Sequence, residues 1–239
     1  MTDVLLTGSQ ENCRLNLVIL SRETRAVHLA ERAELLRALR RWGPDAPTLC
    51  SEWSARRLAA HIVVSEQAAG VPLAAAYPLW RVLPARASAA MQGALSDTGD
   101  RQMDKAEARG WDWLLERLEA GPPRAFGLRL IAELRLVEEW IHHEDVRRGN
   151  GEAPRQMDDR LTSALLCGML AIARLPVFAD SRQGIEAVLP DGHVYSVGRG
   201  ETTVRVRGEV GEIALWVAGR GSAARVEVTG EVAVDALRV

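Results

Sequence analysis

Apolar residues recur every three or four positions along the first part of the chain. Between Thr24 and Trp42 they would lie on one side of a helix, at Ala26, Leu29, Ala33, Leu36 and Leu39. This spacing predicts an amphipathic helix over residues 24–42. The segment 43–47 contains one glycine and two prolines, which predict that the helix ends there.

Three more helices are predicted before residue 150. Ser54 is a candidate N-cap for a helix over residues 55–76, in which Pro72 is expected to kink the last turns. Two further periodic segments cover about 101–119 and 125–148. Four helices separated by Gly- and Pro-containing breaks predict a helical bundle.

The pattern changes after Pro154. One more helix is predicted at about 157–175, and a short one at 211–218. Four short runs read as strands: Ile185–Leu189, Val194–Val197, Thr203–Val206 and Ala224–Val228. Helices followed by strands predict an α+β protein of two domains. We divide the chain into an extension (1–24), a helical bundle (25–154) and a small α+β domain (155–239).

Composition narrows the function classes. Of 239 residues, 47% are hydrophobic and 26% charged, which excludes a disordered chain. The net charge of −2 disfavours a general nucleic-acid partner. Apolar runs are too short to span a membrane. The three cysteines are odd in number and widely spaced, so we expect no disulfide framework and a reducing, cytoplasmic location.

Histidines and a glutamate on apolar stripes are the candidate chemistry. His61 follows Leu58 by three positions and precedes Val64 by three, and Glu138 lies four positions before His142. Residues four apart share a helix face. An ionised carboxylate in a bundle core is costly unless it is paired or binds a metal. Imidazole nitrogen and carboxylate oxygen suit zinc, and also iron, nickel or manganese.

Two alternatives remain open at this point. His61 on an apolar stripe is also typical of a histidine satisfied in the core. Glu139 and His143 have the same spacing one residue further on, about 100° round the helix and toward Arg135, where a solvated pair is expected. The stripe favours Glu138 and His142, but periodicity alone does not decide.

Two segments resemble a known family. Residues 46–61, APTLCSEWSARRLAAH, and residues 137–148, VEEWIHHEDVRR, are similar to the two signatures of the mycothiol-dependent maleylpyruvate isomerase family, within the DinB-like metalloenzyme superfamily. An actinobacterial branch described as metal-binding proteins is especially similar. The resemblance covers about residues 25–239. Its final part, with LWVAGR at 215–220 and VEVTG at 226–230, resembles a sterol-carrier-like α+β domain.

The resemblance implies a DinB-like four-helix bundle with one divalent metal, usually zinc, bound by His61, Glu138 and His142. Three protein ligands leave an open position. In the family this position is thought to receive the thiol of mycothiol, which a metal deprotonates. The implied function is a thiol-dependent isomerase or transferase that acts on a small electrophilic substrate.

Neighbouring residues can support that chemistry. Asp145 is a candidate partner that orients a ligand histidine, or else forms a helix-end salt bridge. Arg147 and Arg148 are candidate clamps for substrate carboxylates, or else complement the helix dipole. We expect Cys50 to be buried and structural rather than redox-active, and Trp53 to pack in the core or to wall the site.

Other functions are compatible with the same residues. The chain can be a non-catalytic, metal-containing ligand-binding or regulatory protein, or a structural protein with a closed, metal-free core. Residues 78–104 are expected to cover the mouth of the metal site. We expect a monomer or homodimer whose partners are a small-molecule thiol and an electrophilic substrate.

Overall fold

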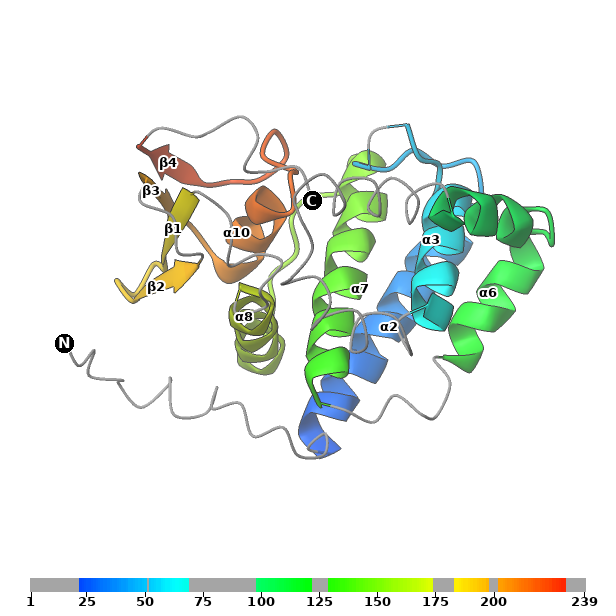
Figure 1. Cartoon of the computed structure of the whole chain (residues 1–239), viewed down its shortest axis with the longest axis horizontal. Helices are drawn as coiled ribbons and strands as arrows, with labels where there is room; N and C mark the ends of the chain where they lie inside the picture. The colour runs from blue at the N-terminus through cyan, green and yellow to red at the C-terminus, as the bar shows by residue number, and fades with distance from the viewer. Residues whose placement is uncertain are drawn as a thin grey trace, which may run out of the picture. The chain divides into compact units, whose positions relative to one another are not determined.

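The computed structural model describes residues 22–50, 52–68, 98–121, 129–173, 183–197 and 202–230. Within these ranges the chain forms helices and one four-stranded sheet, as the predicted α+β class requires (Figure 1). The named helices are α2 (Arg22–Trp42), α3 (Ala55–Ala68), α6 (Trp111–Ala120), α7 (Arg129–Gly149), α8 (Asp159–Ala173) and α10 (Val210–Val217). The strands are β1 (Gln183–Val188), β2 (Val194–Val197), β3 (Thr202–Arg207) and β4 (Glu227–Thr229).

Contacts group the chain into two compact units. One unit contains residues 29–126 and 139–155, and the other contains 1–28, 127–138 and 156–239. Helices α2 and α7 are continuous across this division. The sequence-based division at residues 24 and 154 stays a prediction. No helix in the described ranges has the length and hydropathy required to cross a membrane.

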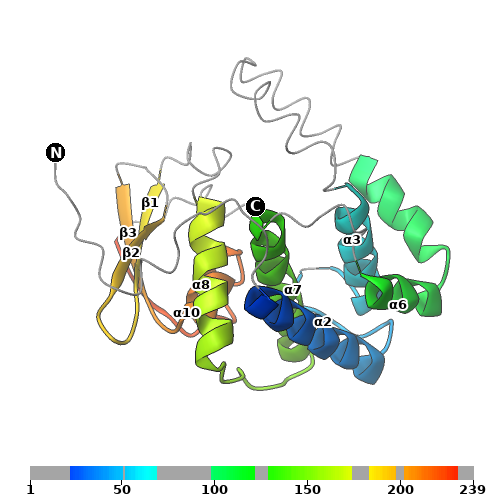
Figure 2. The same ribbon diagram turned by 90° about the horizontal axis from the view of Figure 1, so that it is seen from below.

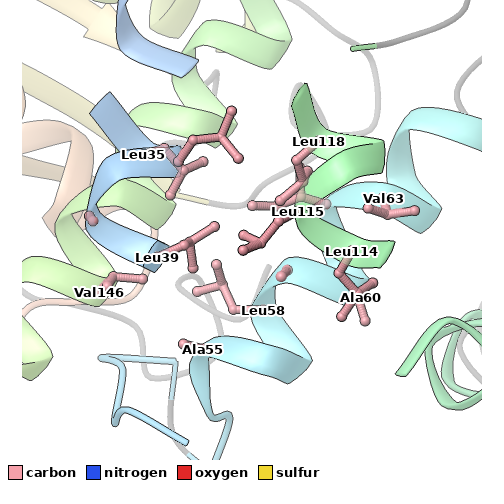
Figure 3. Close-up of a cluster of buried hydrophobic side chains, with 14 of the residues drawn as sticks. Leu35, Leu39, Ala55, Leu58, Ala60, Val63, Leu114, Leu115, Leu118 and Val146 are labelled. Atoms are coloured by element: carbon pink, nitrogen blue, oxygen red, sulfur yellow. The ribbon is translucent and has the colours of Figure 1, made fainter. Parts of the chain in front are cut away.

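The first unit has a core of apolar side chains from α2, α3, α6, α7 and the helix at residues 98–107. Leucines of α2, α3 and α6 meet Val146 of α7 (Figure 3). The fully buried leucines of this core are Leu35, Leu39, Leu58, Leu114 and Leu118. Burying each such side chain contributes roughly 1.5–3 kcal/mol. Hydrophobic burial therefore brings α3 and α7, which carry the candidate ligands, into one packed body.

The third predicted helix was wrong as a single element. Residues 98–107 are helical, and α6 begins at Trp111 after a break. Gly110 has a φ of 95°, which residues with a Cβ rarely adopt. Its N–H donates to the Glu107 carbonyl at 2.9 Å and closes the turn. The apolar spacing continues through the break, so periodicity alone did not reveal it.

The predicted N-cap and α2 are confirmed. The N–H of Arg57 donates to Ser54 Oγ at 3.4 Å, as an N-cap requires at the third helical position. Helix α2 ends at Trp42, where it was predicted to end. The structure describes the second helix as far as Ala68, and the expected kink at Pro72 lies outside the described residues.

The second unit contains the sheet, in the order β2-β1-β3-β4. Strand β1 is antiparallel to β2 and parallel to β3. Val204 and Val206 are fully buried, whereas Arg205 between them is exposed, so one face of the sheet is covered. Helices α8 and α10 pack against each other and lie on the same side of the sheet (Figure 2).

The last strand differs from its prediction. Residues 224–228 were predicted, but β4 covers Glu227–Thr229. The N–H groups of Ala223 and Ala224 both donate to the Arg220 carbonyl, so these residues belong to a turn. Pairing begins only where β3 offers partners, with Glu227 opposite Arg207.

Candidate metal centre

His61 and His142 face each other within the helical unit. His61 lies on α3 and is half-buried, and His142 lies on α7 and is buried. Their ring centroids are 5.2 Å apart at an interplanar angle of 81°. Trp53 contacts the His61 ring at a centroid distance of 5.1 Å. The tryptophan thus lies beside His61 and also packs against the hydrophobic core, so the packing role predicted for it is confirmed.

Glu138 completes a group of three possible ligands with these histidines. It lies one turn before His142 on α7, and its side chain is 26% exposed. One ligand atom each from His61, Glu138 and His142 lie within 4.8 Å of one another. Donor atoms on one tetrahedral zinc ion are separated by about 3.3 Å. The upper limit of 4.8 Å is wider than that separation, and the nitrogen and oxygen donors of the group are of the types that suit zinc.

Asp145 determines the orientation of the His142 ring. Its side chain is fully buried, and its Oδ2 lies 3.0 Å from His142 Nδ1. A buried carboxylate at this distance favours the tautomer in which Nδ1 carries the proton and donates it. Nε2 is then the ring nitrogen with a lone pair for a metal. The predicted orienting role of Asp145 agrees with this contact.

Cys50 reaches the same carboxylate from the loop between α2 and α3. Its Sγ–H donates to Asp145 Oδ2 at 2.9 Å, and Sγ lies 3.9 Å from His142 Nδ1. The sequence suggested only a buried structural thiol. The approach of this loop to α7 joins residues 95 positions apart, and helical periodicity carries no signal for it.

The loop is held against α7 by backbone contacts. The N–H of Leu49 donates to the Asp145 carbonyl at 3.1 Å. The side chain of Asn150 donates to the Pro47 carbonyl at 3.0 Å. A Cβ on Gly149 would lie 2.7 Å from Thr48 Cα, so the absence of a side chain there permits the close approach. These contacts place Cys50 beside Asp145.

The alternative pair Glu139 and His143 has other partners. Both side chains are buried, so the expectation of a solvated pair was wrong. Glu139 forms an ion pair with Arg32. His143 Nδ1 lies 2.9 Å from Glu31 Oε1. Neither residue belongs to the groups of potential metal ligands found within the described ranges.

Glu31 is an ionised carboxylate inside the bundle. Burial by itself would raise its pKa, but hydrogen bonds and charge interactions with His143 and Arg155 outweigh burial. Its pKa is therefore held below the ordinary value of 4.5. The Glu31–His143 contact is one part of a polar network that joins α2 to α7.

Arg147 and Arg148 both bind Glu144. The distances are 2.7 Å from Arg147 Nη1 and 2.6 Å from Arg148 Nε, and the Glu144 side chain is fully buried. Arg147 Nε also lies 3.0 Å from Glu152 Oε2. The carboxylates that these guanidinium groups clamp in the structure are the protein's own. These ion pairs favour a structural role for Arg147 and Arg148 at the end of α7 over contact with a substrate.

Two cysteines, Cys50 and Cys167, lie among the described residues. Cys50 is not part of a disulfide. Cys167 is disulfide-bonded, which the odd number and wide spacing of the cysteines did not predict. Reasoning from spacing alone could not say which cysteines the fold brings together.

An open groove lies beside Trp53. Its volume is about 540 Å³, and its lining residues are Glu52, Trp53, Ser54, Arg57 and Glu107. Burial would lower the pKa of Arg57, but hydrogen bonds with Asp104 and Glu107 outweigh burial and raise that pKa above its ordinary value. The Trp53 ring contacts His61 and also lines the groove. The cover predicted over residues 78–104 lies mostly outside the described residues.

Comparisons with known proteins give similarity at the level of structure. No protein-family model matches the chain. No curated protein sequence matches it either. The solved crystal structure of the mycothiol-dependent maleylpyruvate isomerase is similar, with a TM-score of 0.50 and 20% identity over 88% of this chain and 94% of that one. The structure of a histidine-to-alanine mutant of that isomerase has a TM-score of 0.49 and 19% identity, over 88% of this chain and 94% of that one.

The first of these similarities shows the fold. The chain, in which helices are followed by a small sheet, therefore shares its fold with an enzyme named for a small-molecule thiol. Within this fold, two histidines and a glutamate converge from α3 and α7.

Proposed function

We propose that the chain is a metal-dependent enzyme in which His61, Glu138 and His142 bind one divalent ion, with zinc as the expected metal. The observation that carries this proposal is the convergence of the three ligand atoms within 4.8 Å. The contact between Asp145 and His142 supports it, because metal-ligating histidines commonly donate their other ring N–H to a carboxylate.

The proposed reaction is a thiol-dependent isomerisation or transfer. When bound, the metal would lower the pKa of a coordinated thiol and so supply a nucleophile near neutral pH. The assignment of a low-molecular-weight thiol, such as mycothiol, rests on the resemblance of the two sequence segments and on the name of the structurally similar enzyme. The second substrate is a small electrophile.

The residues around the centre have distinct roles in this proposal. Asp145 holds His142 with Nε2 toward the ligand group and keeps the Nδ1 proton in place. Trp53 packs on His61 and lines the adjacent groove, where its ring offers a substrate an apolar surface. Arg147 and Arg148 hold the end of α7 through Glu144.

Metal content tests the proposal. Untagged protein should contain about one equivalent of zinc by mass spectrometry, and His61→Ala and His142→Ala should contain little while keeping their helical circular dichroism. His193→Ala is the matched control, because His193 is exposed beside a hairpin turn and should leave the metal in place. Full metal in His61→Ala would overturn the site.

Activity then separates the enzyme from its alternative. Metal-loaded protein should accelerate the reaction of mycothiol with an activated alkene or isomerise a substrate of the maleylpyruvate type. A stoichiometric metal without turnover of either would favour the non-catalytic ligand-binding or regulatory protein. The cytoplasmic location and the monomer or homodimer state stay predictions.

A further inference from the structure

Two donor atoms lie beside Nδ1 of His142, on the side of the ring that the proposed metal does not use. Cys50 Sγ lies 2.9 Å from Asp145 Oδ2 and 3.9 Å from His142 Nδ1. The distance between Nδ1 and Oδ2 is 3.0 Å. A sulfur, a nitrogen and an oxygen thus form a small triangle, and each of them can bind a divalent ion.

The size of this triangle fits one tetrahedral ion. With Zn–S near 2.3 Å and Zn–N and Zn–O near 2.0–2.1 Å, the donors on zinc are separated by about 3.3–3.6 Å. The three observed distances lie on both sides of this range and differ from it by a few tenths of an ångström. We propose that Cys50, His142 and Asp145 form a second binding position for a thiophilic divalent ion such as Zn²⁺ or Cd²⁺.

The position is held in place before any ion binds. Asp145 is fully buried on α7, and the same residue's carbonyl accepts the N–H of Leu49 from the loop that carries Cys50. Another hydrogen bond within the loop runs from the Cys50 N–H to Thr48 Oγ1 at 3.1 Å. Cys50 itself is half-buried, whereas His142 and Asp145 are buried.

The two positions compete for His142. A neutral imidazole has one lone pair, so it binds one cation at Nε2 or at Nδ1 but not both. Binding at Nδ1 releases the Cys50 thiol proton to solvent, and the single ring proton of the neutral imidazole moves from Nδ1 to Nε2. This inference rests on the proposed function: a thiophilic ion at the second position inhibits the enzyme because it withdraws His142 from the first metal position.

Cadmium titration tests the second position directly. A thiolate–cadmium bond gives an ultraviolet charge-transfer band, whereas binding to His61, Glu138 and His142 gives none. In full-length His61→Ala, Cd²⁺ should produce this band with about one equivalent bound. In Cys50→Ser the band should be absent, and this variant also reports any contribution from other cysteines.

Two outcomes would overturn the second position: no band in His61→Ala, where the first position lacks a ligand, or an equal band in Cys50→Ser. The result is separable from the proposed function. If Cys50→Ser retains one equivalent of zinc and the band is absent everywhere, the first site stands and the second fails. If neither the wild type nor Cys50→Ser holds zinc, but the band is present with Cys50 and absent without it, the second position stands and the first fails.

Discussion

Arg32 on α2 and Glu139 on α7 form an ion pair in which both side chains are buried. The same guanidinium binds Glu66 of α3, with 2.5 Å between Nη1 and Oε1. Its Nε donates to the Leu118 carbonyl of α6 at 2.6 Å. One arginine therefore joins four helices, including the two that carry the candidate ligands. Burial would lower the pKa of Arg32, but the two glutamates raise it.

Removal of this arginine should be strongly destabilising. Arg32→Met leaves Glu66 and Glu139 buried without their cation, and breaking a buried pair in this way costs about 3–5 kcal/mol. Urea denaturation measures the loss. Arg40→Met is the control, because Arg40 and its partner Glu119 are exposed and the pair is worth about 1 kcal/mol at most. Equal losses of unfolding free energy in Arg32→Met and Arg40→Met would contradict the stabilising role of the buried Arg32 contacts.

Glu138 and Glu139 should separate metal binding from stability. Glu138→Ala is expected to lose the metal with a small change in the free energy of unfolding, since Glu138 is partly exposed. Glu139→Ala should keep its metal when folded but unfold at lower urea, because Arg32 loses a buried partner. Metal analysis of the folded fraction, together with denaturation, distinguishes them. Metal loss confined to Glu139→Ala would show that the ligand register is shifted by one residue.

Acid should weaken the fold through Glu31. Its pKa in the folded state lies below 4.5, so the folded state holds the ionised form more strongly than the unfolded state does. The stabilisation is complete above pH 4.5 and is lost as the pH falls through the lower, folded-state pKa.

Unfolding measured at a series of pH values checks this dependence. Glu31→Gln should be less stable at neutral pH and should lose less stability in acid than the wild type. Glu34→Gln on the exposed side of α2 is the control and should follow the wild type. Identical acid dependence in Glu31→Gln and the wild type would refute the assignment.

Gly149→Ala should loosen the loop that carries Cys50. The new Cβ would lie 2.7 Å from Thr48 Cα and 2.8 Å from the Pro47 carbonyl oxygen, and backbone atoms cannot move aside as a flexible side chain can. Overpacking of this kind costs about 1–3 kcal/mol. Thiol-labelling kinetics should show faster modification of Cys50.

Gly99→Ala is the matched control for that experiment. Its Cβ would meet no atom within 4 Å, and residue 99 is helical. This variant should be as stable as the wild type or slightly more so, because alanine favours the helix over glycine. If Cys50 reacts at the same rate in Gly149→Ala and Gly99→Ala, the close approach does not hold the loop.

Periodicity by itself determined much of the local structure. Helix α2 was predicted over 24–42 and found over Arg22–Trp42, and the strand Val194–Val197 was predicted with the observed bounds. The stripe on α7 placed Glu138 and His142 on one face, because residues four apart are neighbours on any helix. These features depend on interactions between residues close in the chain.

Tertiary structure alone decided which faces meet. The contact of Arg32 with Glu139 spans 107 positions, and that of Cys50 with Asp145 spans 95. Both depend on how hydrophobic burial packs α2, α3, α6 and α7 together, and a repeat of 3.6 residues states only that a face is apolar. Glu139 is therefore buried in an ion pair with Arg32, and His143 is buried against Glu31, because the packed helices supply these partners.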